Sequence, residues 1–253
     1  MSTLGTFVWF DLMTPSLEKA VEYYTYVFGW GTQDWDGPMP YTMFTAEGTA
    51  IGGVMTLPAD AGAAPHWLGY IACDDVKRTV ERVASLGGKV LQPVHEIPTV
   101  GWYAVIADPQ GCVLGLYQSK TPDALVARNR IGTMSWAELN TTDWERAWKF
   151  YSSLFGWKPT SSMDMGGTLG QYFMFEQADG SGQSMGGMSN VATMMGTPAH
   201  WLFYTNVVDI DAGIARVKER GGQVLNGPMD VPGGGKIAQC SDPQGALFAL
   251  YTE

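Results

Sequence analysis

The sequence has few cysteines, few basic residues and no long apolar run. Three cysteines in 253 residues are too few and too scattered for a disulfide framework, and none forms a CxxC pair. Fifteen Lys and Arg stand against 25 Asp and Glu, for a net charge of −10, and no basic block interrupts this acidity. Nucleic acid and anionic membranes are therefore poor partners. Since no apolar run approaches the ~18 residues of a membrane span and no signal-peptide pattern is present, we expect a cytoplasmic protein.

Glycine, methionine and aromatic residues are abundant instead. The chain has 32 Gly, 14 Met, 10 Trp, 11 Tyr and 10 Phe, and 45% of its residues are apolar. This content is sufficient for a full-sized core. Many flat and soft side chains on many turns predict a β-rich body with an adaptable apolar pocket.

The chain contains an internal repeat. Residues 5–30 align without a gap to residues 132–157, with 11 of 26 positions identical and a shared FGW ending. Residues 66–118 align in the same way to residues 200–252 and share the turn DPQG. The offset grows from 127 to 134 between the two blocks, which predicts longer loops in the second copy. We expect a domain at residues 1–118, a linker at 119–131 and a second domain at 132–253.

Each copy repeats a βαβββ unit twice. The first helix is predicted to begin with Thr14 as N-cap and to end at Gly29, and Thr142 and Glu145 have capping-box spacing in the second copy. The other elements predicted in the first copy are strands at 8–12, 32–35, 41–46, 50–55, 66–72, 89–91, 103–107 and 113–117 and a helix at 75–86.

Four such units, the FGW ending and the DPQG turn resemble the vicinal oxygen chelate superfamily. This superfamily includes glyoxalases, extradiol dioxygenases, epimerases and bleomycin-resistance proteins. The chain is most similar to the tandem glyoxalase-like proteins common in actinobacteria, which are often named as hydroxylases. The resemblance implies an α+β fold in which two units form one domain with a mixed sheet that curls around a cup.

The resemblance also identifies positions where metal-dependent members carry their ligands, on the first and last strands of each unit. In this sequence those positions hold Trp9, Trp136, Leu68, Leu202, Gly115 and Ala249. None supplies an imidazole or a carboxylate, and residues 49–57 contain no ligand type. We therefore expect no metal and no cofactor, and the metal-assisted chemistry of the family is not expected here.

Strand alternation predicts which residues face the cups. If Trp9 and Trp136 face inward, so do Asp11 and Glu138, two residues further along. The same alternation brings His66 and His200 inward as candidate acid/base partners of the carboxylates. The ligand-binding residues predicted with them are Trp9, Tyr70, Tyr117, Trp136, Tyr204 and Tyr251.

Structural roles are alternatives for the same residues. Each histidine begins an HWL strand next to a proline, so it could bind a backbone carbonyl at the strand edge. The two carboxylates could accept hydrogen bonds from neighbouring Trp or Tyr side chains. A shifted metal site of Asp11 with His66, or of Glu138 with His200, would have two ligands, fewer than stable sites use. The methionines at 185–195 and Met39, Met43 and Met55 could fill the core or line a pocket.

Two functions remain open. The first is metal-independent binding of a small apolar or aromatic molecule in the cups, for sequestration or resistance. The second is a metal-free lyase, isomerase or hydroxylase-like enzyme that uses the histidine and carboxylate as acid and base, so the sequence does not decide whether the protein is an enzyme. A third possibility is that one copy is purely structural. The expected partner is a small molecule, and the chain is expected to be a monomer or a homodimer.

Overall fold

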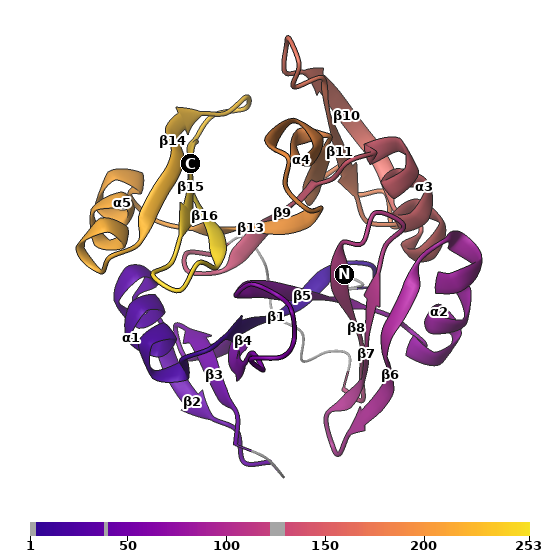
Figure 1. Cartoon of the computed structure of the whole chain (residues 1–253), viewed down its shortest axis with the longest axis horizontal. Helices are drawn as coiled ribbons and strands as arrows, with labels where there is room; N and C mark the ends of the chain where they lie inside the picture. Colours follow the sequence, from indigo (N-terminus) through magenta and orange to yellow (C-terminus); the bar gives the residue numbers. More distant parts are fainter. Residues whose placement is uncertain (1–3, 38–39, 122–129) are drawn as a thin grey trace. The chain divides into compact units, whose positions relative to one another are not determined.

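The computed structural model describes residues 4–37, 40–121 and 130–253 (Figure 1). The predicted linker at 119–131 lies mostly outside the described residues. In the first half the elements are β1 (Phe7–Thr14), α1 (Leu17–Phe28), β2 (Gly31–Asp34), β3 (Thr42–Ala46), β4 (Thr49–Thr56), β5 (His66–Ala72), α2 (Val76–Val83) with a 3₁₀ turn (Ala84–Leu86), β6 (Lys89–Ile97), β7 (Gly101–Ala107) and β8 (Val113–Ser119). In the second half they are β9 (Met134–Asn140), α3 (Trp144–Phe155), β10 (Lys158–Asp164), β11 (Gln171–Glu176), β12 (Gly186–Ser189), α4 (Val191–Met195), β13 (His200–Asn206), α5 (Ile210–Glu219), β14 (Gln223–Asp230), β15 (Lys236–Ser241) and β16 (Leu247–Thr252).

These elements form two mixed sheets of eight strands each, curled but not closed. The strand orders are β2-β3-β4-β1-β5-β8-β7-β6 and β10-β11-β12-β9-β13-β16-β15-β14. Each sheet therefore contains two consecutive βαβββ modules. Within a module the first and last strands run parallel and the others pair antiparallel, as for β1 with β4 and β3 with β4. The predicted α+β fold class, with two domains of glyoxalase type, is confirmed.

Contacts group the chain into two compact units that cut across the sheets. One unit comprises Met1–Val8, Gly69–Leu125 and Ala137–Trp201, and the other comprises Trp9–Leu68, Val126–Trp136 and Leu202–Glu253. The first unit combines most of modules two and three, in which α2 contacts α3. The second combines most of modules one and four, in which α1 contacts α5.

The repeated tyrosine and the DPQG turn account for the pairing of modules one and four. The Tyr24 hydroxyl donates to Oδ2 of Asp242 (3.2 Å), and it accepts a hydrogen bond from Nε1 of Trp67 (3.1 Å). The other carboxylate oxygen, Oδ1, holds the turn by accepting from the backbone N–H groups of Gln244 and Ala246 (2.8 and 2.9 Å). One buried aspartate thus closes its own turn and binds a helix from another module.

Modules two and three use the same arrangement. The Tyr151 hydroxyl donates to Oδ2 of Asp108 (3.1 Å), while Oδ1 accepts from the backbone N–H groups of Gln110 and Cys112 (2.8 and 2.9 Å). Burial raises the pKa of the Asp108 carboxyl above its ordinary value, as it does for Asp242.

The FGW ending of the first helix in each copy has a backbone reason and a packing reason. Gly29 (φ 69°) and Gly156 (φ 74°) end α1 and α3 in the left-handed region, which glycine adopts without a steric penalty. The tryptophan that follows then turns back into the core. Trp157 stacks on Phe175, with ring centroids 4.3 Å apart.

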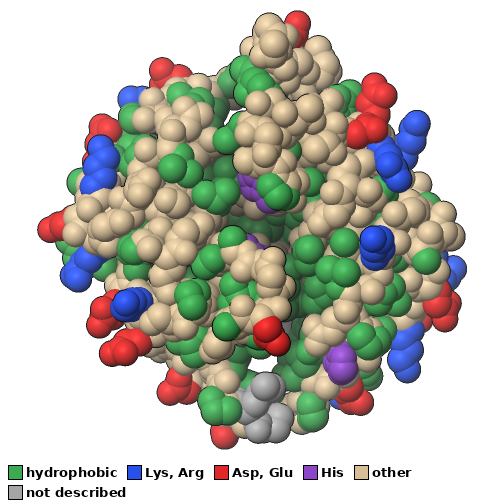
Figure 2. Space-filling model, viewed as in Figure 1, with side chains coloured by type: hydrophobic (Ala, Val, Ile, Leu, Met, Phe, Trp, Pro, Cys, Tyr) green, Lys and Arg blue, Asp and Glu red, His purple; other side chains and the backbone are tan. Residues whose placement is uncertain are grey.

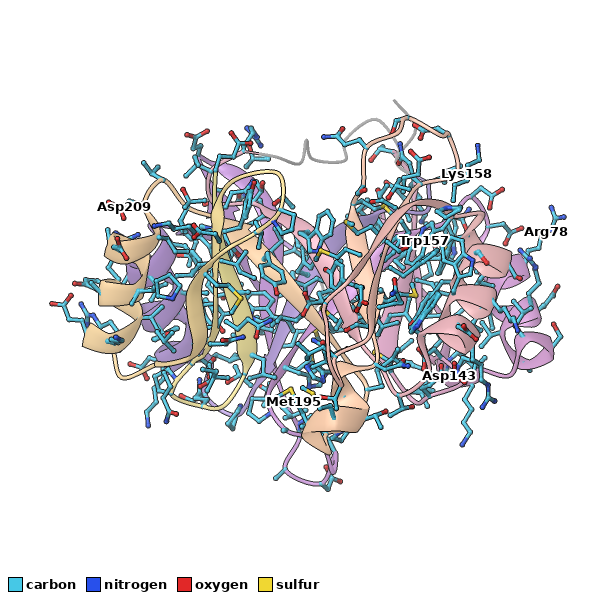
Figure 3. All side chains as sticks on the ribbon, turned by 90° about the horizontal axis from the view of Figure 1, so that it is seen from above. Arg78, Asp143, Trp157, Lys158, Met195 and Asp209 are labelled. Carbon is cyan, nitrogen blue, oxygen red and sulfur yellow. The ribbon has the colours of Figure 1, made fainter. Side chains whose placement is uncertain are left out.

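The predicted helix caps were wrong by one or two residues. Thr14 is the buried last residue of β1, and Ser16 is the N-cap of α1. In the second copy the cap is Asp143, whose Oδ1 accepts from the backbone N–H of Arg146 (3.0 Å), in place of the capping box predicted at Thr142. Figure 3 shows Asp143 beside the helix that it caps. In the first copy the strand continues two residues further than predicted, to Thr14, which delays the start of the helix.

Candidate functional site

The strand register of module one places a set of polar and sulfur-containing side chains on one face of its sheet. Asp11 pairs with Gly53 and Met13 pairs with Met55 across the parallel strands β1 and β4. Met43 on β3 pairs with Gly53 from the other side. Because residues in register on neighbouring strands share a face, these side chains form one surface. That Met43 and Met55 line a pocket stays a prediction. Met39 lies outside the described residues.

The centre of this surface is a hydrogen-bonded group of Trp9, Asp11 and Tyr41, which we call the first cluster. Nε1 of Trp9 donates to the Tyr41 hydroxyl (2.8 Å) and to Oδ1 of Asp11 (3.1 Å). The Tyr41 hydroxyl in turn donates to the same Oδ1. Asp11 is 5% exposed, whereas the two aromatic side chains are half-buried. A carboxylate is thus held at the edge of two aromatic rings.

Gly53 makes room for the first cluster. A Cβ atom at this position would overlap the hydroxyl and ring of Tyr41. The backbone of Gly53 is not in the left-handed region, so here the requirement for glycine comes from the neighbouring ring. Since Gly53 is the register partner of Asp11, the tyrosine ring crosses the strand at the point where it can reach the carboxylate.

Module three repeats this arrangement with Glu138, Asn140 and Tyr172, which we call the second cluster. The Tyr172 hydroxyl donates to Oε2 of Glu138 (3.2 Å), and Nδ2 of Asn140 donates to Oε1 (3.2 Å). Glu138 pairs with Gly187, at which a Cβ would overlap the Tyr172 ring. Both copies therefore place a tyrosine over a glycine and bond it to a buried carboxylate.

Modules two and four carry tyrosines at the matching inner positions. Tyr70 pairs with Gly115, where a Cβ would overlap its ring, so the expected ligand position of the family is covered by an aromatic side chain. Tyr204 pairs with Ala249, and its hydroxyl accepts from Nε2 of Gln239 (2.9 Å).

An apolar cluster surrounds the tyrosine of module four. Leu202, Tyr204 and Ala249 form its buried part, and the half-buried residues Trp136, Ile237, Leu247 and Tyr251 pack against it. In module two, the Tyr117 hydroxyl donates to the backbone carbonyl of Val100 (3.4 Å), and burial raises the pKa of this phenol.

Both histidines bind backbone carbonyls, as the structural alternative predicted. Nδ1 of His66 donates to the carbonyl oxygen of Ala64 (2.8 Å), and Nδ1 of His200 donates to that of Pro198 (3.0 Å). A carbonyl can only accept, so Nδ1 carries the proton in each neutral ring and Nε2 is left as the basic nitrogen. The acid/base role of the two histidines stays a prediction.

The side chains at the expected metal positions do not fit a metal ion. Trp9, Leu68 and Gly115 offer no donor atom of the kind that the family's metal requires, and Tyr70 covers Gly115. Over the described ranges, no group of three His, Cys, Asp or Glu side chains could hold a metal ion. We therefore derive no chemical step through a metal.

Tyr41, Tyr172, Asn140 and Gln239 were not predicted from the sequence. A signal for the two tyrosines is present, because YTMF at 41–44 aligns with YFMF at 172–175 at an offset of 131, between the two blocks of the repeat. The glycine pairs at 52–53 and 186–187 follow in both copies.

Two tandem pairs of βαβββ modules with a polar cluster on the inner face of each sheet define a protein of glyoxalase type. The model of the Glyoxalase/Bleomycin resistance protein/Dioxygenase superfamily matches residues 6–116 and 133–250. The chain belongs to this superfamily.

Relatives of similar length align with nearly the whole chain. The chain is 37% identical over 253 residues to "Putative glyoxylase CFP32" of Mycobacterium tuberculosis (strain CDC 1551 / Oshkosh), covering 97% of this chain and 94% of that protein. It is 28% identical over 261 residues to "Anthracycline biosynthesis protein DauV" of Streptomyces sp. (strain C5), with coverages of 97% and 92%.

Solved structures share the fold at low sequence identity. The Mn(II)-bound glyoxalase from Novosphingobium aromaticivorans matches with a TM-score of 0.69 and 15% identity, covering 100% of this chain and 83% of that one. The 2,3-dioxygenase LapB from Pseudomonas sp. KL28 matches with a TM-score of 0.68 and 12% identity, with coverages of 100% and 93%. At these identities the likeness concerns the fold alone.

On the face drawn in Figure 2, Lys and Arg side chains are dispersed among acidic and apolar ones and do not form a basic patch. In the part of the chain that the structure describes, no helix has the length and apolar character needed to cross a bilayer.

Proposed function

We propose that the protein binds a small aromatic or apolar molecule on the inner faces of its sheets, without a metal ion. The observation that supports this most is the first cluster, in which Tyr41 and Asp11 form a hydrogen-bonded polar group beside the methionines of β1, β3 and β4. Such a mixture of flat, soft and polar groups is typical of small-molecule sites. The matching second cluster supports a binding surface in each copy.

The relatives are consistent with this proposal. One is named for the biosynthesis of anthracyclines and another as a glyoxylase, and both names concern small molecules. The same proposal includes two domains at residues 1–118 and 132–253, a cytoplasmic location and a monomeric or homodimeric state. Sequestration of the bound molecule is the simplest use of a site without a metal centre.

Tryptophan fluorescence tests the binding directly. Trp9 is half-buried and bonded to Asp11, so a ligand on the first cluster should change its emission. We expect saturable changes with some members of a panel of polycyclic phenols, quinones and aromatic amines. Tyr41→Phe, which keeps the ring and removes the hydroxyl, should weaken the binding. The absence of saturable binding across the whole panel would overturn the proposal.

Tyr26→Phe is the matched control. Tyr26 lies on α1, and its hydroxyl donates to the Glu219 carboxylate (2.6 Å) at the protein surface. This variant removes the same atom from a tyrosine–carboxylate pair outside the inner face. Ligand affinity should therefore equal that of the wild type, whereas equal loss in both variants would place the binding elsewhere.

The histidine geometry favours a second candidate, a metal-free acid/base enzyme. The hydrogen bonds from Gly5 N to Ala72 O and from Ala72 N to Thr6 O join the start of β1 to the end of β5, so the two strands run antiparallel. Asp11, late in β1, then falls near the start of β5, where His66 is the first residue. With its proton on Nδ1, the imidazole has a basic Nε2 that could remove a proton from a ligand.

Separate His66→Gln and Asp11→Asn variants test this second candidate. If the pair acts as acid and base, both variants should abolish turnover of a ligand found in the panel while ligand affinity is retained. In His66→Gln, the pH profile of turnover should also lose the part that reflects protonation of the histidine. If affinity and turnover fall together, or if no bound ligand is converted, binding is the whole function.

A further inference from the structure

Lys and Arg are absent from the strand interiors of the described residues, whereas Asp and Glu occur there. In the described part of the chain, Lys and Arg occur in strands only as the first residue, at Lys89, Lys158 and Lys236. The acidic residues in strand interiors are Asp11, Glu96 and Glu138, and two of these three belong to the clusters. Among the described residues, the charge within strand interiors therefore comes from carboxylates.

The clusters add neutral donors and aromatic rings to these carboxylates. Asp11 accepts from the indole N–H of Trp9 and the hydroxyl of Tyr41, and Glu138 accepts from Tyr172 and Asn140. These bonds orient each carboxylate, and every one of these donors is a neutral group. Each cluster therefore combines an anion, which can accept from an organic ammonium group, with an aromatic side chain that can contact the body of a ligand.

We propose that the two clusters select ligands that combine an aromatic body with a positively charged amine, and that they reject anionic ligands. This inference rests on the proposed function and specifies its ligand class. An ammonium group could then donate to the Asp11 carboxylate while the aromatic body of the ligand contacts the neighbouring Trp9 and Tyr41 side chains. A ligand carboxylate at the same place would meet a buried like charge, which costs free energy in a surrounding of low polarity. The net charge of −10 also favours the approach of cations.

Three probes of one shape separate charge from aromatic contact. Naphthylmethylamine is a cation at neutral pH, naphthylmethanol is neutral, and naphthoate is an anion, while the ring system is the same. Calorimetric titration of the wild-type chain should give the tightest binding for the amine, by about tenfold or more over the alcohol, as expected for a hydrogen bond between charged groups. The carboxylate should bind most weakly.

Asp11→Asn and Glu138→Gln test the source of this preference. Each replaces a carboxylate oxygen by an amide nitrogen of the same size and keeps one oxygen that can accept from the cluster's tyrosine. The double variant should bind the amine no better than the alcohol. Glu81→Gln, on the exposed surface of α2, removes one acidic residue away from the sheets and should keep the wild-type preference.

The outcomes distinguish the two proposals. If the three probes bind equally, or naphthoate binds most tightly, the ligand class is wrong while small-molecule binding stands. If the amine preference persists in the double variant, the clusters are not its source and the inference fails. If no probe binds and the aromatic panel is also negative, the proposed function itself is wrong.

Discussion

Tyr24 offers the sharpest test of how the modules are held together. Its side chain is fully buried, and its hydroxyl links Trp67 to Asp242 through hydrogen bonds of 3.1 and 3.2 Å. The substitution Tyr24→Phe keeps the ring in its aromatic surroundings and removes only the oxygen and its proton. Both the indole N–H and the carboxylate oxygen Oδ2 then lose a partner inside the protein.

The magnitude follows from these two losses. A buried polar group left without its partner costs about 1–3 kcal/mol, with the larger figure for a charged group. Allowing for partial relaxation, we expect Tyr24→Phe to lower the free energy of unfolding by about 2–4 kcal/mol. The hydrogen bond from Tyr24 lowers the pKa of Asp242, whereas burial, the larger effect, raises it. The penalty should therefore be larger at pH 8 than near pH 4, because rising pH favours the ionised carboxylate to which the Tyr24 hydroxyl donates.

Urea unfolding followed by circular dichroism at both pH values measures the effect. Tyr151→Phe should behave in the same way, because the Tyr151 hydroxyl donates to Asp108 at 3.1 Å. Tyr26→Phe is the control, since its hydroxyl bonds to a surface glutamate and exposed pairs contribute little. If Tyr24→Phe is no less stable than the control, the buried aspartate does not join the modules as we argue.

Three further outcomes are expected. Gly53→Ala should cost about 1–3 kcal/mol by overlap with Tyr41 and weaken aromatic binding; unchanged unfolding and affinity would contradict the role of this glycine. The Asp242 pKa is raised above 3.8, so its stabilising contribution is present at low pH and is lost as pH rises through the folded-state pKa; Asp242→Asn should reduce this slope in unfolding titrations. Cys73 and Cys240 are buried with pKa values raised to about 12, so a thiol reagent should modify them only after unfolding.

The internal repeat and the spacing of apolar residues predicted the helices and strands. Their ends were harder to predict, because several neighbouring side chains compete for the N-cap position. The apolar spacing of α1 and the glycine after it are local signals, and the structure follows them. The N-cap is a choice among several candidate side chains within three residues. It is decided by where β1 stops, and Leu57 extends that strand by donating its backbone N–H to the Thr14 carbonyl (2.9 Å). That partner lies 43 positions along the chain and is invisible to a local pattern.

The pairing of modules has no local signal. Tyr24 and Tyr151 are equivalent in the repeat, as are Asp108 and Asp242, so the motif alone permits each tyrosine to bind either aspartate. The structure joins Tyr24 to Asp242 and Tyr151 to Asp108. The choice depends on the packing of whole modules, which a residue pattern does not contain.

Alternation along a strand predicted Asp11 and Glu138 as inner residues and missed the tyrosines that bind them. The prediction counted positions from the first strand of each module, whereas Tyr41 lies just before β3 and Tyr172 lies on β11. The glycine opposite the carboxylate is the feature that connects them, because a side chain there would exclude the ring. When a glycine inside a strand pairs with an acidic residue on the next strand, we therefore expect another side chain to lie over the glycine and reach the carboxylate.

The two clusters lower the stability of the fold, and this cost favours a functional reason for keeping them. A glycine inside a strand lacks packing contacts and loses more chain entropy on folding than other residues. Burying a carboxylate also costs free energy, which its hydrogen bonds only partly offset. In a strand without the tyrosine–carboxylate pair, an apolar side chain at position 11 and a larger residue at position 53 would be more stabilising. Both costs recur in module three at Glu138 and Gly187, where Asn140 also donates to the carboxylate. Under the proposed function, the tyrosine–carboxylate pair that both clusters share is the part that binds the ligand.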